Sequence, residues 1–358
     1  MALPAAVTAA LAAPREAGTP AAAAARQALA DHLAGLGYGV EVQPFSFSPA
    51  TLNAFPVLGA GIGWLALLSV PLLLLPGVPR GAALLVLAGG LVALALLTRG
   101  LALGWASTRS GVREDANLIM RRPGVSVRRW IVAHVDTKAQ GHSMAGRLVA
   151  VWVTMLAVAA LIALAALRLG GPPPPSLVAG AAGLALAAGV LAGRGRLRGS
   201  SPGARDNASG VIAALAAAEA AEPDSGVGVL LTGAEEFGLV GARILAQTRP
   251  ELVRGIEVVN LDTIDEQGPV WLVSHDGPGH ALAEALAPGL AVPGVPVRRR
   301  RLPLGIFVDS HPLAQAGGRA VTVARLDWAT LRLLHTPRDT EIDFSSAEIL
   351  GRQVVRSN

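Results

Sequence analysis

The chain has 358 residues, enough for one large domain or two modest ones. Hydrophobic residues make up 52% of it and charged residues only 15%, well below the usual quarter, and its mean hydropathy is +0.50. This charge deficit indicates a chain that is partly embedded in lipid. The net charge of +5 comes almost entirely from arginine, because Lys138 is the only lysine. With 4% aromatic residues and no basic stripe, we expect no nucleic-acid partner. The lack of cysteine excludes disulfides, thiolate zinc sites and a cysteine nucleophile.

Short apolar strands alternate with helices through much of the chain. The patterns predict strands at residues 40–45, 130–133, 227–231, 256–261 and 320–325, and helices at residues 21–36, 209–221 and 239–247. Such alternation is typical of a layered α/β fold with a largely parallel central sheet.

Four stretches are apolar enough to span a bilayer: residues 55–75, 81–98 (continuing past Arg99 to Trp105), 148–167 and 176–193. Each approaches the roughly 20 residues that a transmembrane helix needs. Short turns join them in pairs, so we expect two transmembrane helical hairpins, at residues 55–105 and 148–193. The alternative is a set of buried helices in a large soluble domain, which such long charge-free runs disfavour.

Two hairpins return the chain to the side from which it left. Residues 1–54, 106–147 and 194–358 are therefore expected to lie on one face of the membrane and to fold together. Arginines near the helix ends on that side outnumber Arg80 and Arg168 in the far turns, so the positive-inside rule predicts a cytoplasmic domain. They are Arg109, Arg113, Arg147, Arg194, Arg196 and Arg198. Residues 1–13 also lack the basic and apolar regions of a signal peptide.

Five short motifs contain the ligand set for two metal ions, at or just beyond predicted strand ends. They are His134-Val135-Asp136, Asp206-Asn207-Ala208-Ser209-Gly210, Glu235-Glu236, Asp262 and His335. Two imidazoles and three carboxylates can hold two divalent cations, and a fourth carboxylate remains to move protons. Any one motif is weak alone, since Asp206 could merely cap a helix and the two glutamates could be a solvated first turn. Together they outline a hydrolase.

The same residues resemble the di-zinc aminopeptidases of metallopeptidase family twenty-eight, of the aminopeptidase Y and aminopeptidase S type. The resemblance covers nearly all of the chain outside the apolar stretches. Beyond the five motifs it includes residues 13–20, 36–40, 116–119, 203–205, 233–238, 260–262, 309–311 and 335–340. It implies a zinc-exopeptidase-like three-layer α/β/α domain that carries the two hairpins as insertions.

The resemblance also implies a role for each motif. Asp206 would bridge two zinc ions, with His134 and Asp262 completing one site and Glu236 and His335 the other. Glu235 would be the general base, shuttling a proton to the leaving amine.

Neighbouring residues suggest further roles in the same site. Glu235 and Glu236 can diverge if their backbone is extended. Asp136 is a further catalytic candidate, placed to accept the other ring N–H of His134. Asp309 and His311 are possible substrate or supporting residues, and His275 and His280 are expected at the surface.

The leading hypothesis is a membrane-anchored zinc exopeptidase that removes N-terminal residues from peptides. Carboxypeptidase or glutaminyl-cyclase chemistry within the family stays open, as does a catalytically inactive membrane scaffold. Substrate preference, oligomeric state and the choice among zinc, manganese and cobalt also stay open. Because a hairpin separates His134 from Asp206, we also expect the cleft to lie near the membrane surface.

Overall fold

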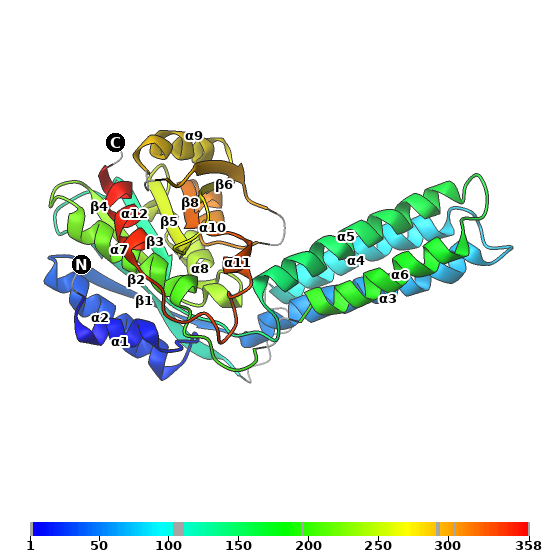
Figure 1. The fold of residues 1–358 in the computed structure, drawn as a ribbon, viewed down its shortest axis with the longest axis horizontal. Coiled ribbons are helices and arrows are strands. Elements are labelled where there is room, and N and C mark those ends of the chain that lie inside the picture. The colour runs from blue at the N-terminus through cyan, green and yellow to red at the C-terminus, as the bar shows by residue number, and fades with distance from the viewer. Residues whose placement is uncertain (1–2, 103–110, 195–196, 291–293, 304–305, 357–358) are drawn as a thin grey trace. The chain divides into compact units, whose positions relative to one another are not determined.

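The structure is a computed structural model that describes residues 3–102, 111–194, 197–290, 294–303 and 306–356. The chain forms two compact units (Figure 1). Met1–Phe47, Val112–Ala139 and Gly199–Asn358 make up the first, which we call the α/β unit, and Ser48–Gly111 and Gln140–Arg198 make up the second, the helical unit. The boundary expected between residues 105 and 106 lies outside the described residues, as do Arg109 and Arg196.

In the described part of the α/β unit, eight strands form one mixed sheet in the order β1-β2-β4-β3-β5-β8-β6-β7. The central strands β4, β3, β5 and β8 are parallel, whereas β2 is antiparallel to β1 and β4, and β6 is antiparallel to β8 and parallel to β7. Their bounds are β1 Gly39–Phe47, β2 Arg113–Arg121, β3 Arg129–His134, β4 Val227–Thr232, β5 Glu257–Ile264, β6 Val270–Ser274, β7 Val297–Arg301 and β8 Arg319–Arg325.

Helices cover both faces of this sheet. Because side chains alternate along a strand, Ile131 packs into the core on one face and Val132 into the core on the other. The first face is covered by α1 (Ala5–Ala12), α2 (Pro20–Gly35), α7 (Ser209–Ala220), α9 (Gly277–Leu286) and α12 (Ser345–Arg356), and the second by α8 (Val240–Thr248) and α10 (Ser310–Gln315). The predicted three-layer α/β/α fold is confirmed.

One strand boundary differs from the prediction in a way that matters for the site. The sequence placed the end of a strand at Leu261, but β5 continues through Asp262 to Ile264. Its register with β8 shifts between Leu261 and Ile264, and Thr263 has a φ of +59°. Asp262 therefore lies in a bulge inside β5, and bulges commonly redirect a side chain near an active site.

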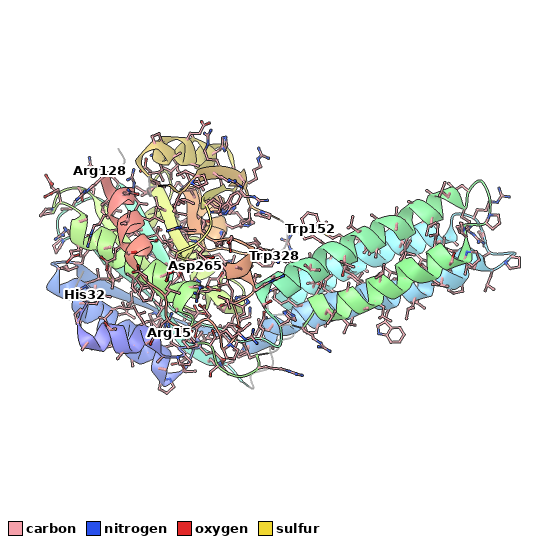
Figure 2. All side chains as sticks on the ribbon, viewed as in Figure 1. Arg15, His32, Arg128, Trp152, Asp265 and Trp328 are labelled. Carbon is pink, nitrogen blue, oxygen red and sulfur yellow. The ribbon has the colours of Figure 1, made fainter. Side chains whose placement is uncertain are left out.

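The helical unit contains four long apolar helices among the described residues: α3 (Ala54–Leu74), α4 (Ala82–Ala102), α5 (Met144–Leu167) and α6 (Pro175–Ala192). Candidate membrane spans within them have mean hydropathies between 1.8 and 2.6. By length and composition, all four could cross a membrane. Large apolar side chains point outward, such as Trp152 on α5, which is 47% exposed (Figure 2).

The two hairpins pack together into one bundle, because α3 packs against α6 as well as against α4. A Cβ on Gly59 of α3 would lie 2.1 Å from the carbonyl oxygen of Gly189 on α6, so only glycine permits this approach. In the far turns, the Arg168 guanidinium donates to the carbonyl oxygens of Leu75 and Val78, at 2.9 and 3.2 Å. This contact joins the α5–α6 turn to the α3–α4 turn.

Candidate metal centre

Two groups of three side chains, which share Asp206, converge in the α/β unit. His134, Asp206 and Asp262 offer ligand atoms within 4.8 Å of one another, and so do Asp206, Glu236 and His335. Asp206 Oδ1 lies 3.1 Å from His134 Nε2, and Asp206 Oδ2 lies 3.1 Å from His335 Nε2. Each oxygen of Asp206 therefore faces a different imidazole, as expected for a carboxylate that bridges two ions. We call the two groups the His134 triad and the His335 triad.

The fold brings these motifs together at one edge of the sheet. Strand β3 ends at His134, β4 ends three residues before Glu235, and β5 carries Asp262. Because β3, β4 and β5 are parallel neighbours, their carboxyl ends meet at the same edge. Polar side chains that follow these strands therefore lie close together at the carboxyl edge of the sheet.

The turn that carries Asp206 is fixed by partners from two other motifs. The main-chain amides of Asp206 and of the residue before it donate to the two carboxylate oxygens of Asp339, at 3.1 and 2.9 Å. Asn207 Oδ1 accepts hydrogen bonds from the amides of Gly210 and Thr263, at 3.0 and 3.2 Å. The loops of Asp206, Asp262 and His335 are therefore locked to one another by hydrogen bonds.

Gly210 is required where α7 begins beside β5. A Cβ at this position would lie 2.2 Å from the carbonyl oxygen of Leu261 and 2.2 Å from Asn207 Oδ1. No larger residue allows the helix to start this close to the Asp262 strand.

Glu235 and Glu236 lie in a 3-10 turn, Glu235–Phe237, so the extended backbone that was the stated condition for their divergence is not present. The turn points the Glu236 carboxylate at His335, with Oε1 3.2 Å from Nε2. The Glu235 carboxylate is 92% buried and makes no hydrogen bond to any described residue. The two neighbouring glutamates thus have different surroundings.

Asp136 supports this turn and contacts His134 differently from the expectation. Its carboxylate accepts hydrogen bonds from the main-chain amides of Glu235 and Glu236, at 3.0 and 3.2 Å. His134 Nδ1 lies 3.1 Å from the Asp136 main-chain oxygen and 3.8 Å from its carboxylate. The ring N–H therefore donates to the main chain, which orients Nε2 towards the triad.

Backbone strain is concentrated at the same loops. Ala234, Thr263 and His335 have φ values of +53°, +59° and +63°, in the left-handed region that residues other than glycine rarely adopt. Each such residue costs about 1 to 3 kcal/mol, and such costs cluster at functional sites. His335 is a ligand candidate, Thr263 follows the ligand candidate Asp262, and Ala234 precedes Glu235.

The site concentrates negative charge away from water. Burial raises the pKa of Glu235 well above its usual value; His134 works against this rise, and Glu236, Asp309 and Asp262 add to it. Burial alone would lower the pKa of His134, but Glu235 and the surrounding carboxylates raise it well above its ordinary range. The carboxylates that surround His134 would also favour a bound cation.

Asp309 and His311 lie on the loop at the start of α10. The Asp309 carboxylate accepts a hydrogen bond from the Thr232 hydroxyl at the end of β4, and burial raises its pKa to about 7. The His311 ring stacks on His275 with centroids 5.1 Å apart, and its Nε2 lies 2.9 Å from Gln315 Nε2. Asp309 thus supports a strand that leads into the site, whereas His311 contacts Gln315 on its own helix and His275.

The donor set fits two divalent metal ions. Its three carboxylates and two imidazoles are ligands that zinc accepts. Glu236 Oε1 is buried and accepts no hydrogen bond among the described residues, although it lies 3.2 Å from an imidazole nitrogen. An oxygen that is buried without a hydrogen bond is costly, and a bound cation would remove that cost.

Two residues at the site received no role from the sequence. Lys138 Nζ lies 3.2 Å from Glu236 Oε2. The sequence feature that could have pointed to it is that it is the only lysine and follows His134 by four residues. Arg15 is fully buried and donates to main-chain oxygens that include those of Val135 and Gly203, at 2.8 and 3.1 Å. It therefore links the His134 loop to the Asp206 loop.

One protein-family model matches part of the chain. Residues 189–352 match the model of peptidase family M28. No curated protein matches the chain.

Among solved structures, the aminopeptidase from Aneurinibacillus sp. strain AM-1 is 16% identical over 98% of this chain and 92% of its own, with a TM-score of 0.51. The glutaminyl cyclase of Fimbriiglobus ruber is 18% identical over 98% and 91%, with a TM-score of 0.52. The glutaminyl cyclase of Bacteroides thetaiotaomicron bound to N-acetylhistamine is 14% identical over 98% and 94%, with a TM-score of 0.55. These structures share the fold of this chain, and the part of the chain that matches the model of peptidase family M28 is residues 189–352.

Proposed function

We propose that the chain is a membrane-embedded, zinc-dependent aminopeptidase that hydrolyses N-terminal peptide bonds. The observation that carries this proposal is the pair of triads sharing Asp206 beside the free carboxylate of Glu235. When bound, two zinc ions would polarise the scissile carbonyl and make a water molecule more acidic. His134 and Asp262 would hold one ion, Glu236 and His335 the other, and Asp206 both.

Glu235 is the residue suited to move the proton. Burial raises its pKa, so its carboxylate accepts a proton more readily than an exposed one at neutral pH. It is free of hydrogen bonds to described residues and can take a proton from the attacking water and deliver it to the leaving amine. Asp136 holds Glu235 in place through the main-chain amide, as a positioning residue.

A membrane setting follows from the four candidate spans. Each hairpin begins and ends in segments that belong to the α/β unit, so both return the chain to one side of a bilayer. Arg113, Arg147, Arg194 and Arg198 flank the spans on that side, against Arg80 and Arg168 in the far turns. We therefore infer that the α/β unit faces the cytoplasm. The nearness of its cleft to the membrane surface stays a prediction.

Glutaminyl cyclisation is the second candidate, because both glutaminyl cyclases and aminopeptidases share this fold. The decisive experiment uses the full chain in detergent. Its zinc content is measured, and it is assayed with a panel of aminoacyl-nitroanilides and with a peptide carrying N-terminal glutamine, each with and without a chelator.

Chelator-sensitive release of nitroaniline, with about two zinc ions per chain, is the expected result. Cyclisation of the glutamine peptide without release of nitroaniline would replace the aminopeptidase assignment. Full zinc occupancy with neither reaction would leave a metal-binding scaffold and end the enzyme proposal.

A further inference from the structure

Lys138 is a buried cation that contacts only one ligand candidate of the two triads. Its Nζ atom lies 3.2 Å from Glu236 Oε2 and 3.2 Å from the Glu236 main-chain oxygen, and the residue is 95% buried. A buried ammonium is stable only where hydrogen-bond acceptors and an opposite charge surround it, which Glu236 supplies here. Its positive charge is thus fixed beside the His335 triad.

This contact gives the two oxygens of Glu236 different tasks. Oε2 accepts the ammonium hydrogen bond, whereas Oε1 faces His335 Nε2 and accepts no hydrogen bond among the described residues. Only Oε1 is left to bind an ion next to Asp206 and His335. The charge that this carboxylate contributes to the ion is also partly offset by the ammonium.

The His134 triad has the opposite surroundings. Asp136 takes no part in either triad, and its carboxylate lies 3.8 Å from His134 Nδ1. At the His335 triad, by contrast, the Lys138 ammonium lies 3.2 Å from the Glu236 carboxylate. A dication is therefore attracted by extra negative charge at one triad and repelled by an ammonium at the other.

We propose that Lys138 makes the two ion sites unequal, so that the His134 triad retains its ion tightly while the ion at the His335 triad is weaker and exchangeable. This inference rests on the proposed function, because it requires that both triads bind metal. The direction follows from Coulomb's law, since like charges a few ångströms apart repel strongly in a buried site.

The test is a metal titration of the full chain in detergent. Metal is removed with a chelator, and Zn²⁺ is then titrated in competition with a chromophoric chelator, which yields two dissociation constants. We expect the wild-type constants to differ by at least about tenfold. His335→Ala should abolish the weaker site and keep the tighter one, and His134→Ala should do the reverse.

The role of Lys138 is tested by its charge. Lys138→Met, which keeps the length of the side chain, should tighten the weaker site by about tenfold or more, and Lys138→Arg should keep the gap. Circular dichroism checks that each variant is folded. If Lys138→Met does not fold, the order of loss in the two histidine variants still decides whether the weak site is the His335 triad.

Three results would overturn the inference: equal constants in the wild type, loss of the tight ion in His335→Ala, or an unchanged gap in folded Lys138→Met. Two equal and tight sites would leave the proposed function intact. No stoichiometric zinc binding by the folded wild type would instead refute the proposed function itself.

Discussion

The two units place charged and apolar side chains in opposite ways. The α/β unit buries ionised groups such as Arg15, Lys138 and Asp339, each held by hydrogen bonds, while its apolar side chains form two cores. The helical unit presents large apolar side chains outward, such as Trp64, Leu85 and Leu156, and packs leucine and alanine inside. This contrast is what water around one unit and lipid around the other would require.

In the proposed function, the α/β unit carries the chemistry and the helical unit anchors the chain, so substitutions in the two units should have different effects. The largest expected effect is chemical. Glu235→Gln removes the proton carrier but keeps the size of the side chain, so kcat should fall about 10²–10⁴-fold. Steady-state assays on a good aminoacyl-nitroanilide measure this loss.

Metal analysis provides the control for that variant. Glu235 belongs to neither triad, so Glu235→Gln should keep the zinc content and melting temperature of the wild type. Loss of zinc together with activity would show that Glu235 binds metal and that the roles of the two glutamates need to be reassigned.

The next effect tests the buried polar interior. The Arg15 guanidinium donates to five main-chain oxygens, three of them in the strand β3 and Asp206 loops. Arg15→Met leaves these oxygens buried without donors, and the free energy of unfolding should fall by about 2 to 4 kcal/mol. Denaturant unfolding in detergent measures the change.

Arg128→Met is the matched control. Arg128 also donates to a main-chain oxygen, that of Ser225, but its side chain is exposed (Figure 2). Its loss should change the free energy of unfolding by less than about 0.5 kcal/mol, as for other surface substitutions. Equal effects of the two variants would mean that burial does not set the strength of these contacts.

The third effect tests the apolar interior of the helical unit. Gly59→Leu would place a side chain against the carbonyl oxygen of Gly189, and overpacking of this kind costs about 1 to 3 kcal/mol. The melting temperature in detergent should fall. Gly180→Leu, at a position with no neighbouring atom within 4 Å, should have little effect.

The zinc content of Gly59→Leu shows whether packing in the helical unit affects metal binding in the α/β unit. All candidate ligands belong to the α/β unit, so folded Gly59→Leu should keep its zinc. Loss of zinc would mean that bundle packing is transmitted to the metal centre and that the contrast between the units is too simple.

Sequence patterns predicted those features of the fold and the site that depend on local composition and on the order of the motifs. Buried strands such as β3 and the four apolar spans follow from runs of hydrophobic residues, and the five motifs named the members of both triads. The bulge at Asp262 and the turn at Glu235 were missed, because each depends on contacts with distant segments. Asp136, for example, binds an amide 99 residues away.

The helical unit shows the same limit. Apolar length identifies each helix, but nothing in one helix names its neighbour, so the α3–α6 contact through Gly59 and Gly189 was not foreseen. The sequence analysis noted Lys138 only as the single lysine of the chain. The effect of its charge depends on which residues it contacts in the folded chain. Its partner, Glu236, is 98 residues away.

The smallest expected effect tests a polar contact of the α/β unit just after the end of β6. His275 was expected at the surface, but it is half-buried, with Nε2 2.7 Å from Ser310 Oγ and its ring stacked on His311. Burial lowers its pKa from the usual 6.5 to about 4; His311 adds to this and Asp276 opposes it. Between these values the unfolded chain binds more protons than the folded one, so the free energy of unfolding falls as the pH drops from 6.5 towards 4.

Because His275 is partly exposed, we expect its share of this loss to be only about 1 kcal/mol between pH 7 and pH 5. His275→Phe keeps the stacked ring but does not titrate, and should lose less stability than the wild type over this range. Denaturant unfolding at both pH values, with chelator present so that the metal ligands respond alike in all proteins, measures the difference. His280→Phe, on the exposed side of α9, should behave as the wild type. An equal pH dependence in all three proteins would show that the stacked imidazole keeps its ordinary protonation, and that the polar interior of this unit does not extend to His275.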